Sequence, residues 1–231
     1  CRKMKLGKVA VTGGSGSLGR HIVDYIREDA DVTVVDIRPP EQQEVRFVEA
    51  DILDFIALEA AFADQDAVIH LAAIPNPRAA APDVTFNTNV QGTWNALQAA
   101  ENAGVRRVLL ASSDSTVGLF YNPEQWGPQY LPVDESHPVR PTEFYSLSKE
   151  VTEVIGRSFA NRGQLEVVAI RPSKIVVPSE WPELEARGLD VRNFHMWAYV
   201  EPEDVAQGFS LALALKAVRF DVFHIAAEET L

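Results

Sequence analysis

The chain has 231 residues, of which 46% are hydrophobic and 23% are charged, and its mean hydropathy is -0.07. This is the composition of an ordinary globular protein, and the length favours one large domain or one domain with a small appendage. The formal net charge of -12, from 33 acidic and 21 basic residues, opposes binding to nucleic acids or anionic membranes, and we expect neither as a partner.

Cysteine content and apolar runs bear on the compartment. Cys1 is the one cysteine of the sequence, which fits a reducing compartment. Histidine and cysteine do not occur at metal-ligand spacing, so we expect no metal. The start of the chain runs too quickly into glycines for a signal peptide, and no apolar run is long enough to cross a bilayer. We therefore expect a cytoplasmic protein.

Short apolar runs alternate with segments of helical periodicity along the chain. The runs that read as strands are Lys8–Gly13, Asp31–Asp36, Val45–Asp51, Asp66–Ala73, Arg106–Ser113, Leu165–Pro172 and Phe220–Leu231. The segments that read as helices are Ser17–Asp29, Asp54–Phe62, Asp83–Ala103 and Thr142–Gly156. Strands this apolar are buried on both faces, and their alternation with helices predicts an α/β fold, a doubly wound parallel sheet of the Rossmann type.

Two long stretches interrupt this alternation. Ser113–Arg140 and Ser173–Met196 are rich in proline, glycine and aromatic residues, and each follows a predicted strand. In an open α/β sheet the loops at the carboxyl ends of the strands form the ligand crevice. We therefore expect these stretches to form the substrate pocket and its lid, although tolerated surface insertions would look the same.

Three glycines after the first predicted strand have the spacing of a dinucleotide-binding loop. Gly13 permits a tight turn, Gly16 lets the backbone approach a pyrophosphate, and Gly19 lets the helix pack on the strand. Ser17 and Leu18 open the following helix, whose free N–H groups favour phosphate. The loop therefore predicts a bound dinucleotide.

Acidic residues at the ends of the next two strands specify which dinucleotide. Asp36, followed by Ile37 and Arg38, suits hydrogen bonds from the ribose hydroxyls and would repel a 2′-phosphate, so we expect NAD rather than NADP. Arg38 could soften that preference. Asp51 could accept from the adenine amine with Ile52 beside the ring, or Asp51 could be a plain helix N-cap.

Tyr145 and Lys149 lie four residues apart on the predicted helix Thr142–Gly156, so both side chains project from one face. One interpretation is a core tyrosine beside a solvated lysine. The other is catalytic: an ammonium and a positively charged nicotinamide both lower the pKa of a phenol, which can then take a proton from a substrate alcohol. A hydroxyl from Ala111–Ser115 would hold the substrate oxygen.

Several motifs in this order resemble the extended short-chain dehydrogenase/reductase superfamily, in its NAD-dependent epimerase/dehydratase group. They are TGGSGSLG at 12–19, Asp36, LAA at 71–73, NVQGT at 89–93, SSDSTVG at 112–118, YSLSK at 145–149 and RPS at 171–173. The resemblance implies a catalytic Ser-Tyr-Lys set with Tyr145 and Lys149. Counting back from Gly118 gives Ser113 as the serine, with Ser112 and Ser115 as alternatives.

The resemblance also implies further contacts with NAD. These are Leu71, Ala72, Ala73, Asn89, Ser112, Arg171, Pro172 and Ser173. Asn89 would brace the active site through the backbone, or it would cap or pack its own helix. The superfamily pairs the Tyr145 helix and the Asp83–Ala103 helix in dimers, so a homodimer is expected.

The substrate is suggested by a short segment after Ser173, which leaves little chain to grip a nucleotide diphosphate. This form is similar to uronate dehydrogenase, which oxidises a free sugar acid at C1, and the resemblance places Asn76, Asp114, Ser115 and Arg192 at the substrate. Arg192 would bind a carboxylate, or it is a surface cation. The uronate enzymes have Asn-His where this chain has Asp114 and Ser115, and the added carboxylate disfavours an anionic substrate.

The sequence therefore predicts an NAD-binding Rossmann domain over residues 1–172 and a small substrate-binding portion over 173–231. The expected activity is NAD-dependent oxidation of a small sugar or sugar acid. Two alternatives stay open: a nucleotide-sugar 4-epimerase or dehydratase, and an NmrA-like binding protein that senses the dinucleotide without catalysis.

Overall fold

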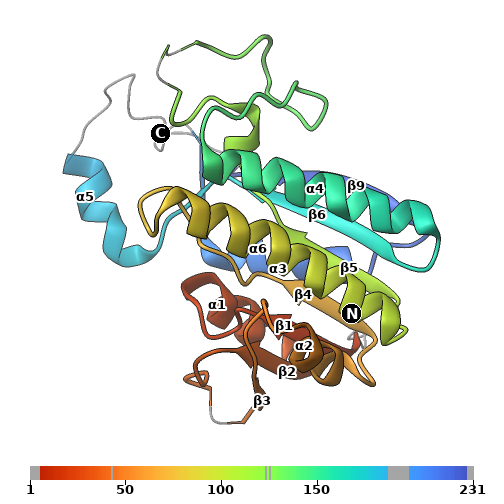
Figure 1. The fold of residues 1–231 in the computed structure, drawn as a ribbon. Helices are drawn as coiled ribbons and strands as arrows, with labels where there is room; N and C mark the ends of the chain where they lie inside the picture. The colour runs from red at the N-terminus through yellow and green to blue at the C-terminus, as the bar shows by residue number, and fades with distance from the viewer. Residues whose placement is uncertain (1–5, 43, 123, 125, 187–197, 228–231) are drawn as a thin grey trace.

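The computed structural model describes residues 6–42, 44–122, 124, 126–186 and 198–227 (Figure 1). Its main feature is a seven-stranded parallel sheet with the strand order β3-β2-β1-β4-β5-β6-β9. These strands are β1 (Gly7–Thr12), β2 (Ala30–Asp36), β3 (Arg46–Glu49), β4 (Ala67–His70), β5 (Arg107–Ala111), β6 (Glu166–Pro172) and β9 (Phe220–Ile225). A second parallel pair joins β7 (Lys174–Ile175) and β8 (Tyr199–Val200). The predicted Rossmann-type fold is confirmed.

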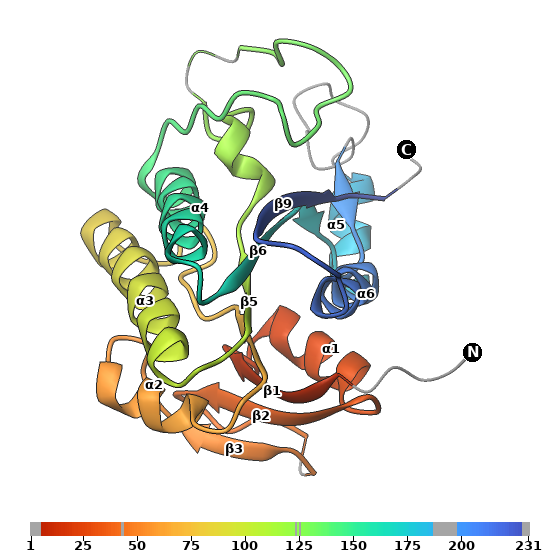
Figure 2. The ribbon, with the colours of Figure 1, turned by 90° about the vertical axis from the view of Figure 1, so that its right-hand side faces the viewer.

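Helices cover both faces of the large sheet, as Figure 2 shows. One face carries α2 (Phe55–Phe62), α3 (Pro82–Asn102) and α4 (Phe144–Arg162), and the other carries α1 (Ser17–Ile26) and α6 (Pro202–Leu213). The short elements are η1 (Asp114–Val117), η2 (Pro178–Glu180) and α5 (Trp181–Ala186). Among the described residues, no helix is long and apolar enough to cross a membrane.

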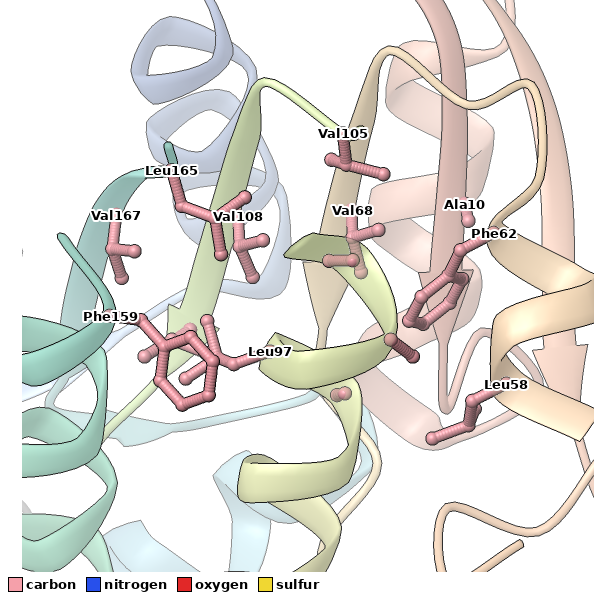
Figure 3. Packing of buried hydrophobic residues seen from close by; sticks show 14 of the residues in the cluster. Ala10, Leu58, Phe62, Val68, Leu97, Val105, Val108, Phe159, Leu165 and Val167 are labelled. Atoms are coloured by element: carbon pink, nitrogen blue, oxygen red, sulfur yellow. The ribbon is translucent and has the colours of Figure 1, made fainter. Parts of the chain in front are cut away.

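The strands are apolar on both sides because each face of the sheet has its own core. Along β1, Val9 and Val11 pack on the α1/α6 side while Ala10 packs on the opposite side. Figure 3 shows the α2/α3/α4 core, in which Phe62 and Phe159 pack with Leu97 against the strands. Burying a large apolar side chain stabilises the fold by roughly 1.5–3 kcal/mol, so these two cores fix the sheet.

The order of the strands positions the ligand crevice. The chain moves outward from β1 through β2 to β3 and then returns to add β4 on the other side of β1. Such a reversal leaves a crevice outside the carboxyl ends of the strands on either side of it. The glycine loop after β1 and the loop after β4 therefore meet at one edge of the sheet.

The helix of Tyr145 is longer than its glycine predicted. Gly156 lies inside α4 rather than at its end. A Cβ at this position would come within 2.7 Å of Leu110 and 3.1 Å of Val167, so the residue has no room for a side chain. That glycine lets the helix approach the sheet closely, and the helix ends instead at Gly163, whose φ is +96°. The predicted last strand is also too long, because β9 ends at Ile225.

Candidate active site

A cavity of about 910 Å³ lies along the carboxyl-end edge of the sheet. It collects most of the residues that the sequence assigned to cofactor and substrate. The assigned residues that line it are Gly13, Gly16, Ser17, Leu18, Gly19, Asp36, Ile37, Arg38, Asp51, Ile52, Leu71, Ala72, Ala73, Asn76, Ser112, Ser113, Asp114, Ser115, Tyr145, Lys149, Pro172 and Ser173. One continuous site therefore joins the glycine loop to the Tyr145 helix.

The glycine loop has the shape that a pyrophosphate requires. Gly13 has φ of +70°, and a Cβ there would lie 2.7 Å from the backbone nitrogen of Ala72. A Cβ on Gly16 would meet one atom within 4 Å, the Gly13 oxygen at 3.2 Å, so the rest of that space belongs to the cavity. Gly16 is also the N-cap of α1 and provides no side-chain cap, which leaves the N–H groups of the first turn available to an anion.

Asp36 organises the adenosine end of the cavity. Its Oδ2 accepts from the Ser15 N–H at 3.1 Å, and its Oδ1 accepts from the Arg38 N–H at 3.2 Å. The carboxylate thus joins the glycine loop to the end of β2 and still lines the cavity. Because a carboxylate accepts about four hydrogen bonds, Asp36 retains capacity for ribose hydroxyls. The residues present therefore fit NAD.

Asp51 is not the cap of α2. Its Oδ1 accepts from the Leu53 N–H at 2.9 Å, whereas Asp54 caps the helix by accepting from the Ala57 N–H at 3.0 Å. The N-cap interpretation of Asp51 was therefore wrong. Asp51 lines the cavity together with Ile52.

Tyr145 and Lys149 are both buried, with 8% and 5% exposure. The Lys149 Nζ donates to the Ala111 carbonyl oxygen at 2.7 Å and lies 5.9 Å from the centroid of the Tyr145 ring. The interpretation of Lys149 as a solvated surface charge was wrong. A buried ammonium beside a phenol at a cavity wall is an arrangement suited to proton transfer.

The three candidate serines have different surroundings. The Ser113 hydroxyl donates to Asp114 Oδ1 at 3.3 Å and lies close enough to the Tyr145 phenol to lower the pKa of that phenol. The Ser112 hydroxyl instead donates to Glu153 Oε1 at 2.5 Å. The Ser115 hydroxyl is buried and has no hydrogen-bond partner among the described residues. Ser113 is thus the serine that the fold brings to the phenol.

Burial has the largest effect on the pKa values of Tyr145 and Lys149. It raises the pKa of Tyr145 above the ordinary value of a phenol, and the bond from Ser113 offsets this only in part. Burial lowers the pKa of Lys149 to about 8, and the Glu153 carboxylate opposes that shift. The lowered Tyr145 pKa was expected with NAD bound, and in the protein on its own burial acts in the opposite direction. The positive nicotinamide would act in the opposite direction to burial.

Two residues that the sequence assigned to NAD, Arg171 and Asn89, do not line the cavity and have other partners. Arg171 forms a buried ion pair with Glu153, and it does not line the cavity. The Asn89 side chain accepts from the Ile74 N–H at 2.8 Å and donates to the Ser148 Oγ at 3.0 Å, so it braces the loop after β4 against α4. The bracing role expected of Asn89 is thus the one its hydrogen bonds support, whereas Arg171 is engaged by Glu153.

Arg192 lies outside the described residues. Other cavity residues were missed by sequence reasoning, which assigned the long stretches only as wholes. They are Val35, Ala50, Pro75, Arg78, Ala111, Phe120, Tyr121, Lys174, Ile175 and Glu180. The aromatic and charged members of this set have no spacing signal, because loops bring them to the cavity. In the part of the chain that the structure describes, no cluster of histidine, cysteine and carboxylate side chains could hold a metal.

Several known proteins are similar to this chain in sequence, and a solved structure is similar to it in fold. L-arabinose 1-dehydrogenase (NAD(P)(+)) of Haloferax volcanii is 32% identical over 213 residues, covering 90% of this chain and 83% of that protein. A putative UDP-glucose 4-epimerase of Methanocaldococcus jannaschii is 34% identical over 191 residues, covering 77% of this chain and 59% of that protein. A crystal structure of a short-chain dehydrogenase/reductase superfamily protein from Agrobacterium tumefaciens with bound NAD superposes with a TM-score of 0.81 at 28% identity, covering 97% of this chain and 79% of that one.

The family model for the NAD dependent epimerase/dehydratase family matches residues 9–226, which include every element that lines the cavity. The glycine loop, Asp36 and the Tyr145–Lys149 pair all lie within this range. The chain therefore belongs to the NAD-dependent epimerase/dehydratase family and is an NAD-dependent enzyme of the short-chain dehydrogenase/reductase kind.

Proposed function

We propose that this protein oxidises a small free sugar or sugar acid at C1, with NAD as the hydride acceptor and Tyr145 as the general base. The observation that carries the proposal is the single cavity lined by the glycine loop at one end and by Ser113, Tyr145 and Lys149 at the other. A substrate alcohol next to Tyr145 would then share the cavity with the bound cofactor.

Each residue would have a distinct part in the reaction. NAD, when bound, takes up the hydride from the substrate carbon. The Tyr145 phenol takes the proton of the substrate hydroxyl, and Ser113, which lies beside the phenol, orients the substrate oxygen. Lys149 is held by the Ala111 carbonyl, so its charge stays beside the phenol. Preorganised groups of this kind need no rearrangement during the reaction.

A free sugar is favoured as the substrate class by two observations. The chain matches most of the length of an L-arabinose 1-dehydrogenase, whose name specifies a free sugar. The cavity that Tyr145 lines is also lined by Asn76, Asp114 and Ser115, whose polar side chains suit the hydroxyls of a monosaccharide. Uronates are kept among the proposed substrates because Arg192 could bind their carboxylate.

A nucleotide-sugar 4-epimerase is the second candidate. It is favoured by the 34% identity with the putative UDP-glucose 4-epimerase, although this chain spans 59% of that protein. Epimerisation would use the same Tyr145 and Lys149 but return the hydride to the sugar, so no NADH would accumulate. The two functions therefore differ in a measurable product.

The experiment is NADH formation at 340 nm with NAD and a panel of free aldoses and uronic acids. A parallel panel of UDP- and dTDP-sugars is analysed for product by chromatography. Rising absorbance with a free sugar supports the dehydrogenase. A converted nucleotide sugar without net NADH, and no response to the free sugars, would favour the epimerase instead.

A further inference from the structure

The charged side chains that line the cavity differ in whether they have a partner. Lys174 forms an ion pair with Glu180 at 2.9 Å, and Lys149 donates to the Ala111 carbonyl at 2.7 Å. Arg78 also lines the cavity and is exposed, and its guanidinium has no ion pair or hydrogen bond within the part of the chain that the structure describes. The Arg78 cation is therefore available to a ligand that enters the cavity.

The loop after β4 holds the backbone of Arg78 in a fixed place. The Asn89 side chain, on α3, bonds both the N–H and the carbonyl of Ile74, at 2.8 and 3.1 Å. Asn76 then accepts from the Arg78 N–H through its Oδ1 at 2.9 Å, and its carbonyl accepts from the Ala79 N–H at 3.3 Å. The guanidinium therefore extends from a braced loop rather than from a free surface turn.

Tyr121 lines the same cavity from the loop that follows η1. Its φ is +57°, in the left-handed region that a bulky residue rarely adopts. The Thr142 hydroxyl donates to the Tyr121 carbonyl at 3.2 Å and helps to hold this conformation. Backbone strain of this kind is concentrated where proteins hold ligands, so the strained Tyr121 is a second candidate for a ligand contact on this wall.

Arg78 and Tyr121 lie close together at the end of the cavity that contains Tyr145. The positive charge of Arg78 is near enough to Tyr121 to lower the pKa of its phenol, although burial has the larger effect and raises that pKa. Tyr121 in turn lies close enough to Tyr145 to raise the pKa of that phenol. Two loops that leave different strands thus bring a guanidinium and a neutral phenol to the substrate end of the cavity.

Two carboxylates near Tyr121 are already engaged elsewhere. Glu143 caps α4 by accepting from two of its N–H groups, at 2.6 and 2.7 Å. Asp114 accepts from the neighbouring serine hydroxyl at 3.3 Å, and its Oδ2 is closed to solvent. Neither carboxylate is paired with Arg78 among the described residues, so both the guanidinium and the phenol keep their donor groups for a ligand.

We propose that Arg78 and Tyr121 form a clamp for an anionic group of the substrate, either a phosphate or a carboxylate. Both side chains donate hydrogen bonds, and a guanidinium matches the oxygens of either group bidentately. The inference rests on the proposed function, because it assigns the substrate of the same site to sugar phosphates or sugar acids rather than neutral sugars.

The test uses hexoses that differ at C6 alone: the free aldose, its uronate and its 6-phosphate, in the gluco and galacto series. Dissociation constants are measured by calorimetry on the NADH-loaded protein, which needs no turnover. We expect one anionic form to bind at least about tenfold more tightly than the neutral aldose, and the tighter of the two identifies the phosphate or the carboxylate as the recognised group.

Arg78→Gln should remove most of this preference, and Tyr121→Phe a smaller part. Both variants should leave the affinities for NADH and for the neutral aldose unchanged. Because the two side chains would hold the same group, the double variant should lose less than the product of the two single losses. The matched control is Arg46→Gln, which removes a positive charge at an exposed position outside the cavity and should change no affinity.

Equal affinities of the wild type for the neutral and both anionic forms would overturn the inference, as would failure of all three to bind. So would a preference that survives Arg78→Gln but is lost in Arg192→Gln, or a loss of NADH affinity in Arg78→Gln, which would place the cofactor at the clamp. The wild-type series and Tyr121→Phe decide the matter even if Arg78→Gln does not fold. Binding with the expected preference but without NADH formation would instead overturn the proposed function and leave the clamp standing.

Discussion

Glu153 and Arg171 form a bidentate ion pair beneath the candidate active site. Arg171 Nε lies 2.7 Å from Glu153 Oε1, Arg171 Nη2 lies 2.7 Å from Oε2, and both side chains are at most 5% exposed. Glu153 lies one helical turn after Lys149 and raises the pKa of that ammonium. The pair therefore connects the middle of α4 to β6.

Removing one partner of this pair should destabilise the fold. Glu153→Gln leaves Arg171 buried without its counter-charge and weakens the acceptor of the Ser112 hydroxyl. We expect a loss of about 3–5 kcal/mol in the free energy of unfolding, measured by urea denaturation. Glu150→Gln on the same helix is the control and should change stability by less than about 0.5 kcal/mol. Equal effects of the two variants would contradict this role.

Tyr145→Phe separates a catalyst from a dinucleotide sensor. The variant removes the proton acceptor but keeps the ring in its buried position, so turnover should fall by about 10²–10⁴-fold. The dissociation constant for NADH, followed by fluorescence titration, should change little. Undiminished turnover would remove Tyr145 from the mechanism. A wild type that turns over no sugar, but binds a protein partner only when loaded with NAD, would favour the sensor.

Gly16→Ala should separate cofactor binding from folding. A Cβ at this position enters the cavity and meets one protein atom, the Gly13 oxygen at 3.2 Å. NAD should bind at least about tenfold more weakly because its pyrophosphate needs that space, while the melting temperature changes little. Gly127→Ala, whose Cβ would have no neighbour within 4 Å among the residues that the structure describes, is the control. Unchanged NAD affinity in Gly16→Ala would mean that the phosphates lie elsewhere.

Asp36→Asn should shift the choice of cofactor. The charged carboxylate disfavours the 2′-phosphate of NADP, and Arg38, which lines the same cavity, can attract that phosphate once the repulsion is removed. The ratio of kcat/KM for NADP to that for NAD should rise by about tenfold, measured at 340 nm with both cofactors. Asp31→Asn, at the other end of β2, should leave the ratio unchanged. The prediction fails if the two variants behave alike.

The expected homodimer has a candidate surface on α3 and α4, which lie side by side on one face of the sheet (Figure 2). Four large apolar side chains on these helices are more than 40% exposed: Val84, Trp94, Leu147 and Val154. Sedimentation velocity at micromolar concentration should give a dimer. Val154→Glu should convert it to a monomer, whereas a monomeric wild type would remove the proposal.

The parts of the site that were predictable from sequence are those encoded by local spacing. The glycine loop and the Tyr145–Lys149 pair each lie within a few residues of chain, so their geometry follows from one turn and one helix. The ion pair of Arg171 was not predictable because its partner, Glu153, lies 18 residues away on a different element. Only the packing of α4 on the sheet reveals that pairing.

The surroundings of each side chain in the folded protein also could not be predicted from the spacing of residues in the sequence. The sequence predicted a lowered pKa for Tyr145 from its neighbour, whereas burial is the larger effect and acts in the opposite direction. Likewise, Asp114 was recognised as a carboxylate near the substrate, but its unpaired Oδ2 is a property of the folded cavity wall. Burial and unsatisfied atoms arise from tertiary packing and leave no periodic signal.

The most direct test of the central claim uses an aldose carrying deuterium at C1. The wild type and Tyr145→Phe are each incubated with this sugar and NAD, and the NADH is analysed by mass spectrometry. Transfer from C1 to the cofactor predicts NADH one mass unit heavier from the wild type and almost none from Tyr145→Phe. Unlabelled NADH, or equal amounts of labelled NADH from both proteins, would contradict the proposed reaction.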